Sequence, residues 1–278
     1  MEKVILITGA SSGIGKATAE YFAGRGWNVI ASMRNPEKET ALNQVPNVLL
    51  VKLDVQDSGT IEQAIKEGVA HFGHIDVLVN NAGYGQSGVF EAITPEQVFK
   101  QFDVNVFGVM NTIRAILPHF RARKTGTILN ISSGAGKFTL PLLSLYASSK
   151  FALEGFSEAL FYELSTLNIK VKIIEPGGTE TNFGKTSNEK FAHNEKLVDY
   201  DPFLAAAGKM FDEMRAVKLI SAEPVAELIY HAATDETDTL RYVIGNEDFM
   251  ARIRARAQMP DQEYVNFIKN GFLKYLSQ

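Results

Sequence analysis

The stretch Val4-Ile-Leu-Ile-Thr-Gly-Ala-Ser-Ser-Gly-Ile-Gly15 decides the fold of this chain. Its first four residues form an apolar run that predicts a short strand, and a helical pattern follows the glycines as far as Gly24. A glycine-rich turn between strand and helix suits phosphate binding, because the turn is tight and the N–H groups of the helix N-terminus face an anion. The glycine spacing, at positions 9, 13 and 15, departs from the usual Gly-x-Gly-x-x-Gly fingerprint.

Strands and helices alternate along the rest of the chain. Short apolar runs predict further strands at residues 28–32, 48–53, 75–79, 127–133 and 170–174. Helices are expected at residues 58–72, from Pro95 onward with Thr94 as N-cap, and from Ser144 to Leu164. This alternation predicts an α/β fold with a parallel sheet and helices on both faces. Ligands of such folds bind at the carboxyl ends of strands, where we expect Gly9, Asp54, Gly83, Ser133 and Pro176.

Composition narrows the functional classes. The 278 residues are 45% hydrophobic and 22% charged, and the formal net charge of -4 gives no reason to expect nucleic acid or an anionic membrane as partner. The absence of Cys excludes disulfides, thiolate nucleophiles and Cys-bound metals. The five His residues show no metal-ligand spacing, so no metal site is expected. No apolar run has membrane-spanning length and no signal peptide is evident, so we expect a cytoplasmic protein.

A tyrosine and a lysine lie four residues apart after the fifth predicted strand. Tyr146 and Lys150 fall on one face of the predicted helix. An adjacent cation favours phenolate, so a tyrosine with an ordinary pKa of about 10 would exchange a proton closer to neutral pH. Ser133, at the end of the strand, can donate a hydrogen bond to an oxygen whose charge changes during reaction. A surface ion-pair helix is the alternative for the Tyr/Lys spacing alone.

The second strand ends at Met33 and Arg34. Dinucleotide folds usually place an acidic residue here, which binds the ribose 2′-hydroxyl of NAD. An arginine, helped by the hydroxyls of Ser11 and Ser12, would instead attract the 2′-phosphate of NADP. The sequence therefore favours NADPH over NADH, and a solvated arginine at a strand end is the alternative.

Two other segments carry small or polar residues at informative positions. Asn80-Asn-Ala-Gly83 directly follows a strand and leaves room for a flat ligand on the backbone. Asn105 and Gly108 interrupt the long helix that begins at Pro95, which indicates either a bend or a functional position.

Together these motifs resemble the short-chain dehydrogenase/reductase superfamily, in its single-domain branch. The matching features are Thr8-Gly-x-x-x-Gly-x-Gly15, Asp54, Asn80 to Gly83, Asn105, Ser133, Tyr146-x-x-x-Lys150, and Pro176-Gly177 with Thr181. The resemblance covers residues 1–182 strongly and adds a seventh strand at residues 241–244. It implies a doubly wound, Rossmann-type parallel sheet of about seven strands in a three-layer αβα arrangement, with residues 1–278 forming a single domain.

The resemblance implies hydride transfer between a nicotinamide and a carbonyl or alcohol. Tyr146 would be the general acid of reduction, Lys150 would lower its pKa and hold the nicotinamide ribose, and Ser133 would polarise the carbonyl. Asn105 would anchor a water that connects Lys150 to solvent, a role implied by the family alone. The implied cofactor contacts are Gly9, Ser11, Ser12, Gly13, Ile14, Gly15, Arg34, Asp54, Val55, Asn81, Ala82, Gly83, Tyr146, Lys150, Pro176, Gly177, Thr179 and Thr181.

Three segments are expected to line a substrate pocket: Tyr84–Ser87, Lys137–Leu143, and an insert from Asn182 to about Ile220. Bulky apolar residues in the insert predict a mobile lid over a bulky hydrophobic ketone, although packing of helices on the sheet would explain them too. These residues are Phe183, Phe191, Tyr200, Phe203, Met210, Phe211 and Met214. A helical extension is expected over residues 247–278.

The preferred hypothesis is an NADP-dependent reductase of a bulky hydrophobic ketone, similar to NADP-preferring ketone reductases and 17β-hydroxysteroid-dehydrogenase-like members. A 3-oxoacyl-carrier-protein reductase is the alternative enzyme, although the long lid and the C-terminal extension count against it. A non-catalytic NADP-sensing regulator is the alternative from another class. The family also implies a homodimer or homotetramer formed through helices at residues 95–118 and 145–166.

Overall fold

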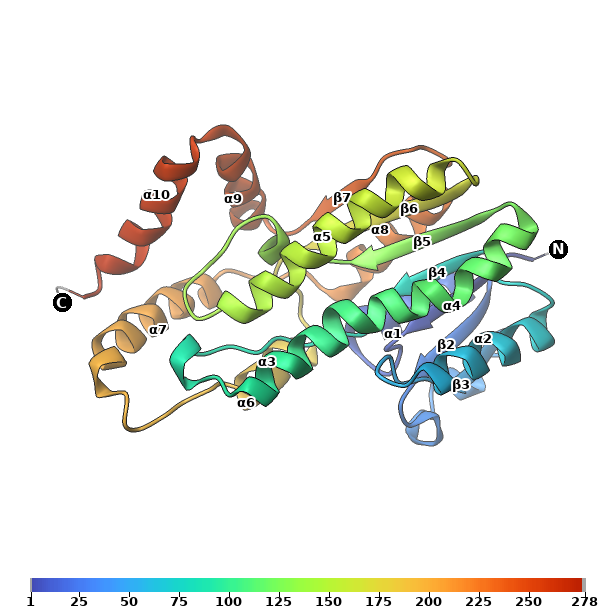
Figure 1. Cartoon of the computed structure of the whole chain (residues 1–278), viewed down its shortest axis with the longest axis horizontal. Coiled ribbons are helices and arrows are strands. Elements are labelled where there is room, and N and C mark those ends of the chain that lie inside the picture. The colour runs from blue at the N-terminus through green and yellow to red at the C-terminus, as the bar shows by residue number, and fades with distance from the viewer. Residues whose placement is uncertain (1, 277–278) are drawn as a thin grey trace.

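A computed structural model describes residues 2–276, whose strands form one parallel sheet (Figure 1). The strands are β1 (Val4–Thr8), β2 (Asn28–Met33), β3 (Val48–Lys52), β4 (Val77–Asn80), β5 (Gly126–Ile131), β6 (Ile169–Pro176) and β7 (Arg241–Ile244). Their order in the sheet is β3-β2-β1-β4-β5-β6-β7, so the winding direction reverses between β1 and β4. This is the predicted doubly wound fold, and its switch point is where ligands of such sheets bind.

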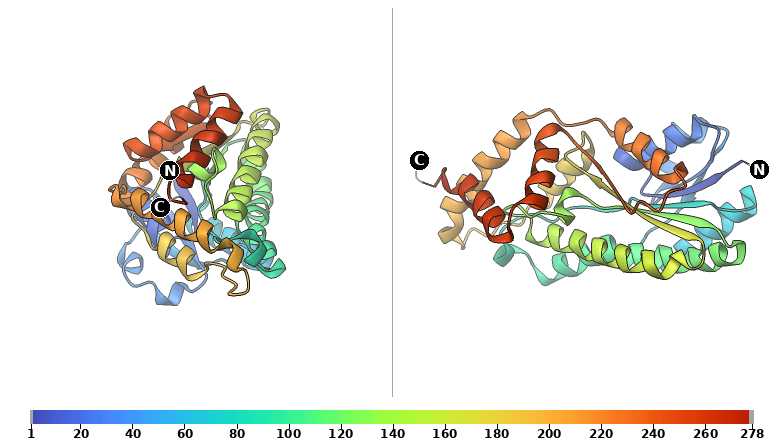
Figure 2. Two further views of the ribbon diagram at one scale, coloured as in Figure 1. Left: turned by 90° about the vertical axis from the view of Figure 1, so that its left-hand side faces the viewer. Right: turned by 90° about the horizontal axis from the view of Figure 1, so that it is seen from above.

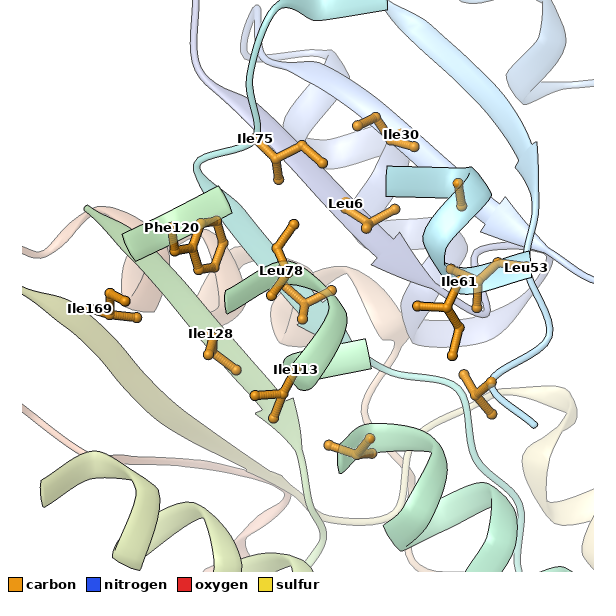
Figure 3. Packing of buried hydrophobic residues seen from close by; sticks show 14 of the residues in the cluster. Leu6, Ile30, Leu53, Ile61, Ile75, Leu78, Ile113, Phe120, Ile128 and Ile169 are labelled. Atoms are coloured by element: carbon orange, nitrogen blue, oxygen red, sulfur yellow. The ribbon is translucent and has the colours of Figure 1, made fainter. Parts of the chain in front are cut away.

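Helices cover both faces of the sheet. One face carries α2 (Ser58–Phe72), α4 (Gly108–Arg123) and α5 (Ser144–Ser165), and the other carries α1 (Gly13–Ala23) and α8 (Ala222–Thr234). Side chains alternate along β1, so Val4 and Leu6 join the core under α2 and α4, whereas Ile5 and Ile7 join the core under α1. Figure 3 shows the first of these cores, in which Leu6, Leu78 and Ile128 of three strands pack against Ile61, Ile113 and Phe120 of the helices. Strands that are buried on both faces explain why their sequences are continuously apolar.

The ends of several helices follow from local sequence. Asp57 accepts hydrogen bonds from the N–H groups of Gly59 and Thr60 and caps α2, which ends at Gly73 with a φ of +83°. Thr94 and Gln97 form a capping box for α3 (Pro95–Phe102). The predicted interruption is a π-helical turn, η4 (Asp103–Phe107), which joins α3 to α4. The bend expected at Asn105 is thus a change of helical pitch.

The C-terminal part of the chain builds a helical cover beyond the carboxyl ends of the strands. It contains α6 (Asn182–Glu189), α7 (Asp201–Ala216), α9 (Glu247–Gln258) and α10 (Asp261–Leu273). Figure 2 shows α7, α9 and α10 grouped at the end of the molecule away from the N-terminus. Short turns of helix complete the fold: η1 (Pro36–Lys38), η2 (Leu42–Gln44), η3 (Phe90–Ala92), η5 (Gly134–Gly136) and η6 (Val198–Tyr200). No helix within residues 2–276 is both long and apolar enough to cross a membrane.

Among the strand boundaries that differ from prediction, two have a clear structural cause. β6 continues to Pro176, beyond the predicted end at residue 174, because Glu175 and Pro176 pair with Val243 and Ile244 of β7. β4 begins at Val77 instead of Ile75, since the N–H of Ile75 donates to the imidazole of His119 on α4 and leaves the ladder. Both differences arise from contacts with distant parts of the chain.

Candidate active site

The glycine-rich turn after β1 is built from backbone that only glycine adopts easily. Gly9 and Gly13 have φ values of +68° and +56°. A Cβ at Gly15 would come within 2.4 Å of both the carbonyl oxygen of Gly9 and Nδ2 of Asn81. Ser12 precedes α1 without capping it through its side chain, and the first turn carries no acidic residue. The N–H groups at the start of α1 are therefore available to an anion.

Asn81 fixes this turn from the next strand of the sheet. Its Nδ2 donates to the carbonyl oxygens of Thr8 and Gly9, both at 3.0 Å. The hydroxyl of Thr8 accepts from the N–H groups of Asn81 and Ala82, again at 3.0 Å. These four hydrogen bonds join the carboxyl ends of β1 and β4, so the turn is held in shape before any ligand binds. Thr8 was not predicted as a site residue. Its hydroxyl contributes by binding the backbone N–H groups of Asn81 and Ala82.

A cavity of about 720 Å³ opens at the carboxyl ends of the strands. Most of the predicted cofactor residues line it: Gly9, Ser11, Ser12, Gly13, Ile14, Arg34, Asp54, Val55, Asn81, Ala82, Gly83, Tyr146, Lys150, Pro176, Gly177, Thr179 and Thr181. Gly15 does not line it, because it lies beneath the turn in contact with Gly9 and Asn81. The methyl group of Thr181 would meet a Cβ at Gly13 at 3.2 Å, so segments 168 positions apart in the sequence close on each other here.

Ser133, Tyr146 and Lys150 meet on one side of the cavity. The hydroxyl of Ser133 hydrogen-bonds to the phenol of Tyr146 and also accepts from the N–H of Ala135 at 3.1 Å. Nζ of Lys150 donates to the carbonyl oxygen of Ile131 at 2.8 Å and lies 5.8 Å from the centre of the Tyr146 ring. The predicted trio is therefore assembled, with the lysine anchored to the end of β5.

The pKa of Tyr146 differs from the expectation drawn from its spacing to Lys150. Burial raises the pKa of Tyr146 to about 12, and the hydrogen bond from Ser133 only partly offsets this. Burial also lowers the pKa of Lys150 to about 8, opposed by the carboxylate of Glu154. Desolvation dominates both pKa values, because both groups are enclosed by protein. The phenol is thus protonated at neutral pH and suited to donate a proton.

Asn105 lies next to the site but does not line the cavity. Its Oδ1 accepts from the N–H of Tyr84 at 3.1 Å, and its Nδ2 donates to the carbonyl oxygen of Tyr84 at 2.9 Å and to Ser149 at 3.2 Å. The side chain therefore pins the loop after β4 to helix α5. Both ends of its side-chain amide have protein partners, and the role of Asn105 as a water anchor stays a prediction.

Some residues of the predicted pocket segments line the cavity, whereas others hold neighbouring parts of the chain in place. Tyr84, Phe138, Leu140, Leu143, Phe183, Phe211 and Met214 line the cavity. Gln86 and Ser87 do not: Gln86 donates to the carbonyl oxygen of Lys190 at 2.5 Å, and the carbonyl oxygen of Ser87 accepts from Ala192 at 2.8 Å. They hold the base of the lid instead. Phe203 also lies outside, because its ring packs against Phe272 of α10 at 5.7 Å between centroids.

Two aromatic rings stand next to the Ser/Tyr/Lys trio. The ring of Phe183, at the start of α6, lies 5.6 Å from that of Tyr146 between centroids. Phe249 of α9 packs against three glycines, and a Cβ at Gly134, Gly177 or Gly245 would come within 2.6 Å of its ring. Phe249 was missed as a site residue, although the three glycines after β5, β6 and β7 signal that a large group approaches the backbone there.

The comparison with known families decides which protein class this architecture represents. Residues 3–192 match the short chain dehydrogenase family. The chain belongs to that family. Because the match covers most of the sequence and includes the glycine turn and the Ser/Tyr/Lys trio, this short-chain dehydrogenase is an oxidoreductase.

Relatives of this short-chain dehydrogenase include enzymes from yeast and bacteria. An uncharacterized oxidoreductase of Schizosaccharomyces pombe is 42% identical over 217 residues, which cover 77% of this chain and 89% of the relative. A 3-ketodihydrosphingosine reductase of Bacteroides thetaiotaomicron is 40% identical over 199 residues, which cover 71% and 72% of the two chains.

Solved structures share the fold over nearly the whole length. A short-chain dehydrogenase from Streptomyces avermitilis superposes with a TM-score of 0.80 at 32% identity, covering 96% of this chain and 97% of its own. ElxO, solved with NADP bound, gives 0.71 at 28% identity, with 87% and 98% covered. A Burkholderia phymatum enzyme in complex with NAD gives 0.77 at 25% identity, with 92% and 93% covered.

Proposed function

We propose that this short-chain dehydrogenase transfers hydride between NADP(H) and a bulky, apolar ketone or the corresponding secondary alcohol. One observation carries the proposal: a single cavity runs from Arg34 past Tyr146 and Lys150 to the apolar side chains of the lid. A dinucleotide and an apolar substrate can therefore share one enclosed space with the proton donor between them.

The residues of the cavity fit a nicotinamide dinucleotide. The glycine turn leaves backbone N–H groups and the start of α1 open to phosphate, and added Cβ atoms at Gly9 or Gly15 would collide with backbone or Asn81. Asp54 and Val55 would contact adenine, Asn81 to Gly83 would pass beneath the adenosine, and Pro176 to Thr181 would hold the nicotinamide end.

Preference for NADP is supported by the surroundings of Arg34. It is exposed at the end of β2 and lines the cavity together with Ser11 and Ser12. Within residues 2–276, no ion pair to a carboxylate is found for Arg34. Its guanidinium can therefore bind a 2′-phosphate without first giving up a partner. Among the solved neighbours, ElxO holds NADP and the Burkholderia phymatum enzyme holds NAD, so the shared fold alone does not decide the cofactor.

The test of the cofactor is R34D. A carboxylate at this position repels a 2′-phosphate and accepts from a ribose hydroxyl, so the ratio of kcat/KM for NADPH to that for NADH should fall by at least tenfold. Lys38, which does not line the cavity, provides the control variant K38D. A ratio that is equal in R34D and wild type would exclude the phosphate contact.

The side chains of the trio perform the proton transfer. Bound NADPH would supply the hydride that adds to the carbonyl carbon of the substrate. Tyr146 donates its phenolic proton to the carbonyl oxygen, which completes the alcohol, and Ser133 donates a hydrogen bond to the same oxygen. The phenolate left behind is stabilised by the positive charge of Lys150. In alcohol oxidation the same groups act in reverse, with Tyr146 as the base.

The apolar lining supports a bulky ketone as the substrate class. Phe138, Leu140, Phe183, Phe211, Met214, Leu219 and Phe249 surround the end of the cavity next to Tyr146. The name of the Bacteroides relative, a 3-ketodihydrosphingosine reductase, also specifies a keto substrate. A 3-oxoacyl-carrier-protein reductase stays the alternative enzyme; side chains of α6, α7 and α9, which belong to the insert and the C-terminal extension, line the cavity and favour a free ketone over a carrier-bound chain.

The decisive experiment is a panel of ketones and secondary alcohols assayed with NADPH and NADH. We expect kcat/KM to rise with the apolar bulk of the ketone and to be higher with NADPH. Tight binding of NADPH without turnover of any ketone or alcohol would favour the non-catalytic NADP sensor. Preference for a carrier-bound 3-oxoacyl chain over free ketones would favour the alternative enzyme.

We also propose that the chain forms a homo-oligomer through α3, α4 and α5. Large apolar side chains on α3, on the turn η4 that joins it to α4, and on α5 are exposed: Phe99, Phe107, Phe151 and Tyr162. A second copy would cover them, since exposed apolar surface is costly to leave in water. Light scattering should give at least twice the monomer mass for the wild type and a lower mass for F99D. A monomeric wild-type protein at micromolar concentration would contradict this proposal.

A further inference from the structure

A cluster of buried charged side chains lies behind the catalytic lysine. Glu154 stands one helical turn after Lys150 on α5, and both side chains are buried. Oε1 of Glu154 and Oγ of Ser132 lie 3.3 and 2.9 Å from the position that a Cβ at Gly136 would take. Ser132 directly follows Ile131, whose carbonyl oxygen accepts from Lys150. The carboxylate of Glu154 and the ammonium of Lys150 therefore lie along the same short piece of backbone.

The remaining charges of the cluster come from three other elements. Arg241 of β7 donates through Nε to Glu154 at 3.0 Å and through a terminal nitrogen to Glu158 at 2.5 Å. The same Nε lies 3.3 Å from Glu175 of β6, and Lys137 after η5 is 3.8 Å from that carboxyl group. Burial and the neighbouring Glu154 raise the pKa of Glu175 to about 7. Arg241 thus anchors the carboxylate of Glu154, and Lys150 lies one turn earlier on the same helix.

One oxygen of Glu154 is not used by this ion pair. Oε2 binds Arg241, whereas Oε1 is buried and has no hydrogen-bond partner within residues 2–276. A buried carboxylate oxygen without a partner is costly, so it needs a compensating charge nearby. The only cation on α5 is Lys150, one turn before Glu154; burial lowers the pKa of Lys150, and the charge of Glu154 opposes this change.

We propose that Glu154 is a positioning residue that acts through Lys150: its carboxylate, held by Arg241, keeps the ammonium of Lys150 charged inside the enclosed site. The importance of this charge for turnover rests on the proposed function. The pairing itself does not, because the protonation of Lys150 can be measured in the protein without substrate or nucleotide. An internal carboxylate would thus maintain the positive charge that stabilises the phenolate of Tyr146.

The direct test follows the ionisation of Lys150 by NMR. Protein labelled with ¹³C at Cε of lysine is titrated with pH, and the signal of Lys150 is assigned by its loss in K150R. We expect E154Q to lower the titration midpoint by about one pH unit, since an opposite charge at this range is removed. E158Q is the matched control, because Glu158 also binds Arg241 but lies one turn farther from Lys150. Equal midpoints in E154Q and wild type would overturn the proposal.

The second test uses the pH profile of ketone reduction. Lys150 is charged below its pKa, so a lower pKa in E154Q moves the basic limb of kcat to lower pH, whereas E158Q leaves it in place. A purely structural role of Glu154 would reduce activity by the same factor at every pH. If the wild type reduces no ketone, the proposed function fails, and the NMR midpoints alone decide the role of Glu154.

A conservative variant covers the case in which E154Q does not accumulate as folded protein. E154D retains the charge on a side chain that is shorter by one methylene, which withdraws the carboxylate from the cluster. Its Lys150 midpoint should then lie below that of the wild type by a fraction of a pH unit. An E154D midpoint equal to that of the wild type, with E158Q also unchanged, would overturn the proposal.

Discussion

The nucleotide side and the substrate side of the cavity are held together in different ways. Around the glycine turn, four hydrogen bonds among Thr8, Gly9, Asn81 and Ala82 each join a side chain to a backbone group. The cover formed by α6, α7, α9 and α10 is joined mainly by aromatic contacts and by exposed ion pairs such as Lys274–Glu213. Directional bonds specify one shape, whereas apolar contacts permit several. The nucleotide side is therefore preorganised, and the substrate side can adapt.

Removal of the phenolic hydroxyl should have the largest effect. Y146F keeps the ring that packs on Phe183 but has no proton to donate, so kcat should fall by at least about 10³-fold. The dissociation constant for NADPH, measured by fluorescence, should stay within about twofold, because the nucleotide side is independently formed. Y162F, on the exposed face of the same helix, should retain full activity. Substantial turnover by Y146F would remove Tyr146 from the proposed role.

Ion pairs of the sheet and of the cover should differ in their contribution to stability. Lys172 of β6 is buried and binds Asp235 and Tyr242, so D235N leaves an uncompensated ammonium and should lower the free energy of unfolding by about 3 kcal/mol. E213Q breaks the exposed pair with Lys274 and should cost at most about 1 kcal/mol. Urea unfolding of both variants makes the comparison. Equal losses would contradict the distinction between the two regions.

Asp235 also makes the stability of the sheet region sensitive to acid. Burial would raise the pKa of Asp235, but hydrogen bonds from Lys172 and Tyr242 outweigh it and lower the pKa from 3.8 to about 2. The carboxylate therefore stabilises the folded state above the unfolded pKa, and this contribution is lost as the pH falls through about 4 to about 2. Wild type should lose stability across this interval more steeply than D235N, as measured by urea unfolding at each pH.

A methyl group in the glycine turn should weaken nucleotide binding specifically. G15A places Cβ at 2.4 Å from the carbonyl oxygen of Gly9 and from Asn81, so the turn must open. The dissociation constant for NADPH should rise by at least about tenfold, equivalent to 1.4 kcal/mol. A Cβ at Gly155 meets no atom within 4 Å, so G155A should bind NADPH normally. Normal binding by G15A would show that the turn is less rigid than its hydrogen bonds indicate.

The smallest effect is expected on the adaptable side. F183A removes the ring next to Tyr146, an aromatic contact worth about 1 kcal/mol, and should raise KM for bulky ketones by up to about tenfold with little change for small ones. F191A is the control, because Phe191 is equally exposed in the same cover but does not line the cavity. A fall in kcat for every ketone would mean that Phe183 positions Tyr146 and does not select the substrate.

The features that the sequence predicts well are those that neighbouring residues determine. Helix α2 has the predicted bounds, Ser58 to Phe72, because Asp57 and Gly73 mark its ends locally. The glycine turn and the spacing of Tyr146 and Lys150 are likewise set by neighbouring residues. The sheet fold follows from the alternation of predicted strands and helices. The pKa of Tyr146 was not predictable, because its burial depends on Phe183 and on the cover.

Contacts between distant segments account for the other differences. Phe249 reaches the cavity only because α9 crosses the ends of β5, β6 and β7, and Glu154 faces Arg241 from 87 positions away. Asn105 was singled out correctly as unusual, but its hydrogen bonds to Tyr84 depend on how the turn η4 packs against the loop after β4. Packing between elements, which no local pattern encodes, decides these roles.

The position of Phe249 on Gly134 and Gly177 has a consequence for biosynthesis. The ring that packs on the ends of β5 and β6 belongs to a residue translated 118 positions after the end of β5 and 73 after the end of β6. A growing chain on the ribosome can form the strands from β1 through β6 and the glycine turn before Phe249 has been synthesised. The apolar lining of the cavity next to Tyr146 is therefore complete only after synthesis has passed helix α9.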